Sequence, residues 1–136
     1  MSVLVSIIIP TFNREHLILD TLKSAQNQSY RNFECIIVDD NSNDNTDEIV
    51  KQFCVNDSRF RYFKRPSNRL KGANACRNFG LENSKGDFIN WLDSDDLLTE
   101  NHIQEHLLVY EDHKAINASV SEAGTFVEFI GDSEQK

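Results

Sequence analysis

The sequence predicts an α/β fold, a mostly parallel sheet with helices on both faces. Short runs of β-branched and other apolar residues alternate along the 136-residue chain with stretches whose apolar side chains recur at helical spacing. The apolar runs are nearly continuous, which is typical of strands buried on both faces of a parallel sheet. The resulting order β-α-β-α-β-α-β-α favours right-handed crossovers around one hydrophobic core.

Four strands and four helices follow from these patterns. We expect strands at Val3–Ile9, Phe33–Val38, Phe60–Phe63 and Asp87–Leu92. We expect helices from Glu15 to residues 27–29, around Ile49, Val50 and Phe53, from Gly72 to the Lys85-Gly86 turn, and from a Thr99 cap to about His113.

Several finer expectations accompany these elements. Pro10 should end the first strand, and Asp39 should open the loop after the second. Leu17 and Leu108 should lie on the inward faces of their helices. Alternation across Ala118–Ile130 suggests one or two further strands, and the polar tail, Asp132–Lys136, should fray.

Composition excludes several classes of partner. The net charge of −8 argues against nucleic acid, whose phosphates require stripes of Lys and Arg. No apolar stretch approaches the roughly 20 residues of a membrane span. The three cysteines lack metal-ligand spacing, so we expect reduced thiols and a cytoplasmic location, with the inner face of the membrane as a further option.

An acidic cluster follows the strand that ends at Leu92. Asp93, Asp95 and Asp96 place three carboxylates within four positions, and such like charges raise one another's pKa unless a cation lies between them. Mg²⁺ and similar ions bind carboxylates while keeping open positions for phosphate. Asp39 and Asp40 repeat the pattern after the second strand, which predicts a binding site at the carboxyl ends of the strands.

The residue types at this edge suggest separate contacts to a metal, a base and phosphates. Asp95, helped by Asp93, could hold a metal that bridges a diphosphate. Asp39 or Asp40 could accept a hydrogen bond from a base, and Phe12 could stack on it. Some of the nearby cations could meet phosphate oxygens: Arg65, Arg69, Lys71 and Arg77.

Four motifs in order resemble family-2 glycosyltransferases with a GT-A, Rossmann-like fold. They are Val5-Ser6-Ile7-Ile8-Ile9-Pro10-Thr11-Phe12-Asn13, then Gln28-Ser29-Tyr30 with Phe33 to Ser42, the helix Gly72 to Leu81, and Gly86 to Asp96, which resembles the DxD segment. Each motif alone is weak evidence. The set, spread from about Val3 to His113, is strong evidence.

The resemblance implies a nucleotide-sugar donor, usually UDP-linked, with Mn²⁺ or Mg²⁺ bound by Asp95 and Asp93. It implies inverting transfer to a glycan or lipid-linked acceptor, as in polysaccharide biosynthesis. The nucleotide-binding residues that we expect are Pro10, Thr11, Phe12, Asn13, Asp39, Asp40, Arg77, Asn78, Asp93 and Ser94.

In that family the acceptor site and catalytic base lie in a second half, beyond the DxD segment. We therefore expect residues 1–136 to form a single, incomplete GT-A-type domain that ends after the DxD segment and its following helix, with the general base absent. The chain would then be mainly the donor-binding half of the enzyme, and whether it forms a homo-oligomer stays open.

Other interpretations use the same residues. The chain could be a noncatalytic nucleotide-binding or assembly module. Asp39, Asp40 and Asp93 also resemble the acidic pocket of receiver domains, and His102-Ile103-Gln104-Glu105-His106 matches the H-x-x-E-H pattern of inverted zinc peptidases. The blandest alternative is that the acidic residues only cap helix N-termini.

Overall fold

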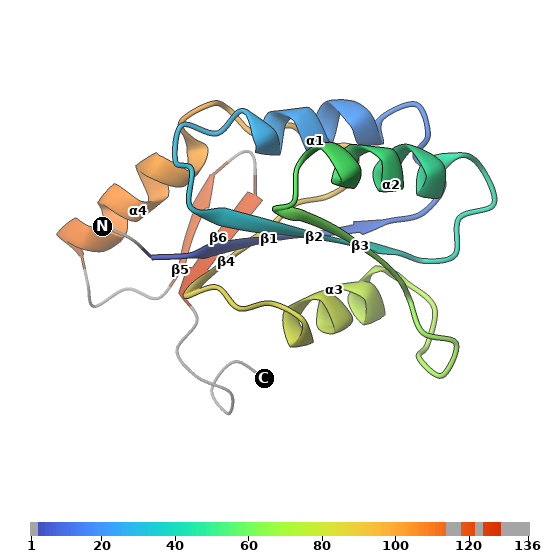
Figure 1. Ribbon diagram of the computed structural model, residues 1–136. Helices are drawn as coiled ribbons and strands as arrows, with labels where there is room; N and C mark the ends of the chain where they lie inside the picture. The colour runs from blue at the N-terminus through green and yellow to red at the C-terminus, as the bar shows by residue number, and fades with distance from the viewer. Residues whose placement is uncertain (1–2, 114–117, 122–123, 129–136) are drawn as a thin grey trace.

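The computed structural model describes residues 3–113, 118–121 and 124–128. The described strands form one sheet in the order β3-β2-β1-β4-β6-β5 (Figure 1). The elements are β1 (Val5–Thr11), α1 (Ile18–Gln26), β2 (Phe33–Asp39), α2 (Thr46–Asn56), β3 (Phe60–Lys64), α3 (Ala73–Glu82), β4 (Phe88–Trp91), α4 (His102–Asp112), β5 (Ala118–Ser121) and β6 (Gly124–Glu128).

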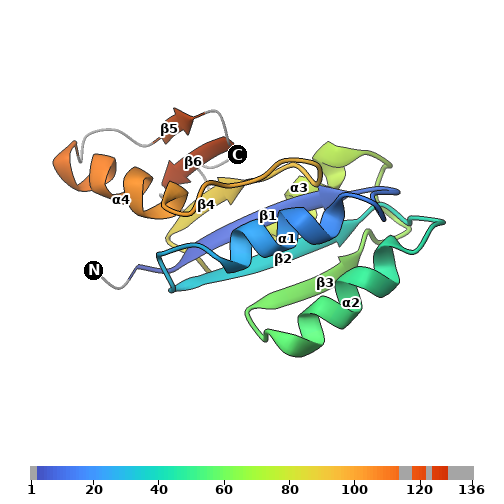
Figure 2. The ribbon, with the colours of Figure 1, turned by 90° about the horizontal axis from the view of Figure 1, so that it is seen from above.

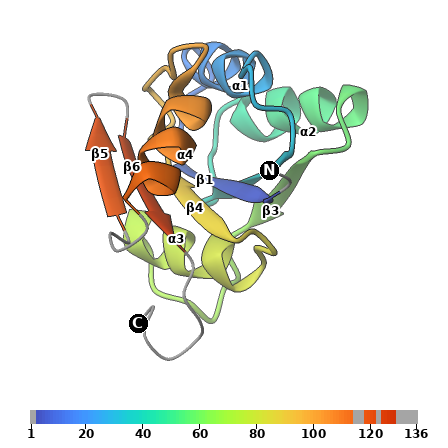
Figure 3. The ribbon, with the colours of Figure 1, turned by 90° about the vertical axis from the view of Figure 1, so that its left-hand side faces the viewer.

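The predicted α/β architecture is confirmed. Strands β1 to β4 pair in parallel, whereas β6 joins β4, and β5 joins β6, in antiparallel pairs. Helices α1 and α2 cover one face of the sheet and α3 covers the other (Figures 1 and 2). Seen from the end of the sheet, α4 lies on the same side as α1, close to β4 and β6 (Figure 3).

The alternation of side chains along the central strands separates two cores. Ile7 and Ile9 of β1 pack with Leu22 of α1 and Ile103 of α4 on one face. On the other face, the β2 residues Ile36 and Val38 pack against Cys76 of α3. Both faces of the central strands are therefore buried, as continuous apolar runs predict.

Pro10 does not end the first strand, contrary to the prediction. The strand begins at Val5 and continues through Pro10 to Thr11, which pairs with Asp39 of β2. The backbone N–H of Leu92 donates to the carbonyl of Ile8, so even-numbered β1 residues direct their polar groups towards β4. Because β4 ends opposite Ile8, the N–H that proline lacks would have had no strand partner.

Two helix starts also differ from the prediction. Helix α1 begins at Ile18 instead of Glu15, because a turn precedes it in which the Leu17 N–H donates to the Arg14 carbonyl. Leu17 is consequently exposed rather than inward. Helix α4 begins at His102, so its N-cap position is Asn101 and not the predicted Thr99. Thr99 lies in the turn before the helix, where its carbonyl accepts hydrogen bonds from the His102 N–H and from Gln28.

Leu108, like Leu17, is exposed, with 52% of its surface accessible, although the helical spacing predicts that it lies on the inward face. Its neighbours Ile103 and Leu107 are buried as expected. Among the described helices, none combines the length and apolarity that crossing a bilayer requires.

Two strands, β5 and β6, form within the tail, which confirms the alternation signal. The predicted fraying of Asp132–Lys136 falls outside the described residues.

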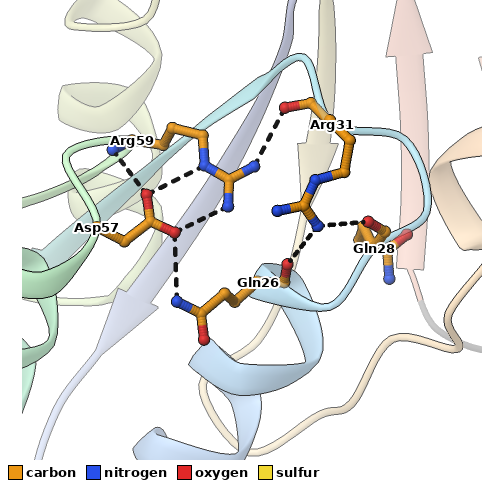
Figure 4. A network of polar contacts seen from close by, with 5 residues as sticks. All are labelled: Gln26, Gln28, Arg31, Asp57 and Arg59. Atoms are coloured by element: carbon orange, nitrogen blue, oxygen red, sulfur yellow. Dashed lines mark hydrogen bonds and ion pairs between the residues drawn. The ribbon is translucent and has the colours of Figure 1, made fainter.

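A polar network joins α1 to the starts of β2 and β3, at the amino edge of the sheet (Figure 4). The carboxylate of Asp57 accepts hydrogen bonds from the Arg59 guanidinium at 3.1 and 2.8 Å and from the Gln26 side chain at 3.3 Å. Arg31 donates to the Gln26 and Gln28 carbonyls, both at 3.2 Å. This network fixes α1 at the edge opposite the carboxyl ends of the parallel strands.

Candidate functional site

The carboxyl ends of the parallel strands meet at one edge of the sheet. Thr11 pairs with Asp39, and the Leu92 N–H that follows β4 donates to Ile8, so the loops after β1, β2 and β4 leave the sheet side by side. A cavity of about 350 Å³ opens between these loops and the start of α3.

Most of the predicted site residues line this cavity. They are Pro10, Thr11, Phe12, Asp40, Arg77, Asp93, Ser94 and Asp95. Three predicted residues do not: Asn13, Asp39 and Asn78. The structure therefore brings most of the predicted residues together at one cavity and leaves Asn13, Asp39 and Asn78 outside its lining.

Asn13 shapes the loop after β1 instead of lining the cavity. Its backbone adopts a left-handed conformation with φ of 51°, which Asn tolerates better than most residues. Its N–H donates to the Ser42 hydroxyl at 2.8 Å, and its side-chain carbonyl accepts from the Asn43 N–H at 2.9 Å. These bonds join the loops after β1 and β2 and hold Phe12, 48% exposed, at the cavity wall.

Asp39 is a buried structural carboxylate. One oxygen accepts from the Ser42 N–H at 3.0 Å and the Ser42 hydroxyl at 2.6 Å, and the other accepts from the Tyr62 hydroxyl at 2.6 Å. Burial and the Asp39 carboxylate together raise the pKa of Tyr62 well above its usual value. Asp39 therefore orders the turn that presents Asp40.

Asp40 faces the cavity but already has partners on both carboxylate oxygens. One oxygen accepts from the Arg65 guanidinium, and the other accepts from the Gly72 N–H at 2.9 Å. Arg65, only 7% exposed, also donates to the Arg69 carbonyl at 2.6 Å. Asp40 thus anchors the predicted basic loop, and Arg65 and Arg69 are engaged with Asp40 and Glu82.

The two DxD aspartates are each paired with a different arginine. Arg77 of α3 donates to the Asp93 carboxylate at 3.0 Å and to the Asn74 side chain at 2.9 Å. The Arg14 guanidinium lies 3.8 Å from the Asp95 carboxylate. Within the cavity, the two arginines therefore face the two aspartates of this segment.

The backbone of the acidic loop is fixed by α1. The buried Thr21 hydroxyl contacts the carbonyl oxygens of Ser94 and Asp96. Desolvation, together with the negative charges of Asp95 and Asp93, raises the pKa of the Asp96 carboxyl. Asp96 does not line the cavity, so the carboxylates that face it are those of Asp93, Asp95 and Asp40.

Three cavity residues were not predicted: Arg14, Ala73 and Cys76. Ala73 and Cys76 share a helical face with Arg77, so helical spacing from Arg77 could have identified them. Burial, followed by the charge of Asp40, raises the pKa of the Cys76 thiol to about 11, so this thiol is neutral at physiological pH. Arg14 had only a weak signal, its position two residues after Phe12.

The cavity offers two candidate metal ligands. No cluster of three or more His, Cys, Asp or Glu side chains suited to a metal occurs in the described part of the chain. Asp93 and Asp95 nevertheless line one cavity with roughly half of each side chain exposed. This arrangement fits an ion such as Mg²⁺ that is held by one or two carboxylates and completed by phosphates and water.

The histidines of the H-x-x-E-H pattern are core residues. The rings of His102 and His106 lie 4.5 Å apart, and both residues are buried. Burial, and secondarily the charge of His106, lowers the pKa of His102 to about 4, so the ring is neutral at physiological pH. The described residues bring no cluster of metal ligands around this pair.

The sequence of this chain is similar to those of known glycosyltransferases. Residues 6–130 match the family described as Glycosyl transferase family 2. A Campylobacter jejuni protein named GalNAc(5)-diNAcBac-PP-undecaprenol beta-1,3-glucosyltransferase is 42% identical over 93 residues, covering 68% of this chain and 30% of its own. The chain spans about a fifth to two fifths of the length of its curated relatives.

Solved structures agree on the fold. The crystal structure of S. aureus TarS 1-349 in complex with UDP-GlcNAc matches with a TM-score of 0.72 and 28% identity, over 81% of this chain and 32% of that one. The mannosyltransferase PcManGT from Pyrobaculum calidifontis, in complex with GDP-Man and Mn²⁺, matches with a TM-score of 0.72 and 23% identity, over 84% and 34%.

The predicted resemblance is therefore confirmed, and it argues against the receiver and zinc-peptidase interpretations. The structural neighbours also confirm the predicted GT-A fold, of which this chain covers only a part. Because the family match covers most of the sequence, the chain belongs to glycosyltransferase family 2.

Proposed function

We propose that the cavity binds the diphosphate of a nucleotide-sugar donor, a UDP-sugar, together with Mn²⁺ or Mg²⁺. The observation that carries this proposal is the grouping of Asp93, Asp95 and Arg77 around one cavity at the carboxyl edge of the sheet. Carboxylates for a cation and a guanidinium for phosphate oxygens are the pair of groups that a metal-diphosphate complex requires.

The base would bind at the other end of the cavity. Phe12 offers an exposed ring on which a planar base can stack, and Asp40 retains acceptor capacity beside the start of α3. The part of the cavity wall between the base and the phosphates would be formed by Pro10, Thr11 and Ser94. The UDP-GlcNAc complex of the TarS structure supports uridine as the base.

Transfer would proceed with inversion at the anomeric carbon. An acceptor hydroxyl, deprotonated by a general base, attacks the sugar from the face opposite the diphosphate. When bound, a divalent cation supplies charge neutralisation for the departing diphosphate. Asp93 and Asp95 would hold that cation, and Arg77 would orient the phosphates from α3.

The acceptor is proposed to be a glycan or lipid-linked saccharide. The undecaprenol-linked saccharide in the name of the C. jejuni relative supports a lipid-linked acceptor. A cytoplasmic site at the membrane surface would suit such a reaction, and this chain would contribute mainly the donor-binding half.

Calorimetric titration of UDP tests the proposal. Binding should be tight with Mn²⁺ and much weaker with EDTA, and Asp95→Asn should remove the difference. Asp112→Asn provides a matched control, because Asp112 is an exposed carboxylate at the end of α4. Equal UDP binding with and without Mn²⁺ would refute the metal-dependent donor site.

A transfer assay then separates the enzyme from a noncatalytic module. UDP release that requires an added lipid-linked saccharide acceptor would support catalysis. If the protein binds UDP but releases none from a UDP-sugar with any acceptor added, the result would support the nucleotide-binding or assembly alternative.

A further inference from the structure

Arg14 lines the cavity beside Asp95. Its guanidinium lies 3.8 Å from the Asp95 carboxylate, and the two side chains are 43% and 46% exposed. Both side chains line the same cavity. The contact is therefore loose, solvent-accessible and directed at the carboxylate that is the best candidate metal ligand.

The backbone of Arg14, in contrast, is firmly held. Its N–H donates to the hydroxyl of the buried Thr46 at 2.8 Å. Its carbonyl accepts from the N–H groups of Leu17 and Ile18 at 2.9 and 2.8 Å, at the start of α1. The fold thus fixes the backbone of Arg14, whereas its guanidinium can change partners within the cavity.

Arg77 differs from Arg14 in this respect. Its guanidinium donates two hydrogen bonds, to Asp93 and Asn74, both of 3.0 Å or less. The Arg14 contact with Asp95 exceeds hydrogen-bond distance, so less is lost when it breaks. Of the two arginines, Arg14 is the one whose pairing a competing cation displaces more easily.

Charge balance gives this displacement a consequence. A divalent cation that binds Asp95 competes with the guanidinium for the same oxygens and adds two positive charges to the cavity. A diphosphate restores neutrality, and its oxygens are the better bidentate partners for a released guanidinium.

We infer that Arg14 is an exchangeable counter-ion. It pairs with Asp95 when no donor is bound, and it transfers to a phosphate oxygen of the donor when a divalent cation takes Asp95. This inference rests on the proposed donor site and adds a second diphosphate-binding residue, on the loop after β1, opposite Arg77 on α3.

The exchange predicts opposite effects of one substitution on two ligands. In Arg14→Gln, Mn²⁺ alone should bind about threefold more tightly, because the competing charge is gone, as measured from the electron paramagnetic resonance signal of free Mn²⁺. UDP at saturating Mn²⁺ should bind about tenfold more weakly in calorimetry, because a charged phosphate contact is lost. Uridine, which lacks phosphate, should bind as in the wild type.

Two further variants control this experiment. Lys85→Gln removes the same charge from an exposed residue at the opposite edge of the sheet and should change neither affinity. Arg14→Lys keeps the charge and should retain most of the UDP affinity. Thermal unfolding of each variant checks that the fold is retained, which is expected because the backbone of Arg14 makes the structural contacts.

The outcomes distinguish the inference from the function on which it rests. Wild-type protein that binds UDP without dependence on Mn²⁺ would overturn the donor site and the role of Arg14 together. Metal-dependent binding in the wild type, with Mn²⁺ and UDP affinities unchanged in Arg14→Gln, would overturn only the exchange. Weaker binding of both Mn²⁺ and UDP in Arg14→Gln would likewise refute the exchange, because a simple attractive contact predicts that both affinities change in the same direction.

Discussion

The side-chain hydroxyl oxygen of Thr21 lies 2.7 Å from the backbone carbonyl oxygen of Asp96. The same hydroxyl lies 3.0 Å from the Ser94 carbonyl, and one turn later the Ser24 hydroxyl accepts from the Leu98 N–H at 3.1 Å. Gln28 continues this row and bonds the Ile103 N–H. One face of α1, together with Gln28 just beyond its end, therefore fixes the backbone that runs from the DxD segment to α4.

Replacement of Thr21 by Val should loosen this attachment. The substitution keeps the volume but leaves two carbonyls without the hydroxyl, so we expect the free energy of unfolding to fall by about 1–3 kcal/mol. The affinity for UDP with Mn²⁺ should fall as well, because the backbone of Asp93 and Asp95 loses its support. Urea denaturation and calorimetry measure the two effects. Thr21→Ser, which retains the hydroxyl, should resemble the wild type, and equal losses in both variants would contradict this role.

Gly80 should not tolerate alanine. A Cβ at this position would lie 2.6 Å from Cγ2 of Ile8, so α3 must move away from the sheet. Helix propensity alone would favour alanine by about 1 kcal/mol, whereas overpacking costs about 1–3 kcal/mol. We expect a net loss of stability in thermal unfolding, opposite in sign to the propensity effect. Ile8→Ala in the same chain should relieve part of the loss, and strict additivity would argue against the clash.

Asp40 should matter for stability as well as for binding. Asp40→Ala leaves the buried guanidinium of Arg65 without its counter-ion, which costs about 3–5 kcal/mol for a fully buried pair. Urea denaturation should show a loss of this order without any nucleotide present. A variant as stable as the wild type would mean that Asp40 serves only the ligand.

Asp57 should make the protein sensitive to acid. Hydrogen bonds from Arg59 lower the pKa of the Asp57 carboxyl to about 2, from an ordinary value of 3.8. Because the folded state has the lower pKa, its stabilising effect is complete above about pH 4 and disappears as the pH falls towards 2. Asp57→Asn should reduce the free energy of unfolding by roughly 2 kcal/mol at pH 7. Urea denaturation at several pH values should show this difference shrinking below pH 4, and a constant difference would contradict it.

The sequence predicted the sheet edge well because the signals there are local. Buried strands are marked by continuous apolar runs, and Thr11, Asp40 and Asp93 each lie at or beside a strand end, so topology alone brings them together. The same reasoning could not separate Asp39 from Asp40. Adjacent residues at a strand end point in opposite directions, and only the position of Tyr62 on β3 decides that Asp39 is the buried one.

Contacts between residues far apart in the sequence explain why the predictions missed the positions of Thr99 and Arg14. Thr99 is a residue type that favours caps, but it lies in the turn before α4, where Gln28, 71 positions earlier in the chain, donates to its carbonyl. Arg14 is positioned by a backbone hydrogen bond to Thr46 and an ion pair with Asp95, and neither residue is near it in sequence. Such contacts depend on how α1 docks, which periodicity does not encode.

The position of Pro10 also affects what can approach the cavity. Beyond Ile8, which pairs with Trp91, no described strand lies beside β1 on the β4 side, and a backbone N–H there could pair with an extended peptide. Proline removes that donor at the point where β1 reaches the cavity wall. Strand addition is thereby disfavoured at the point where β1 meets the cavity.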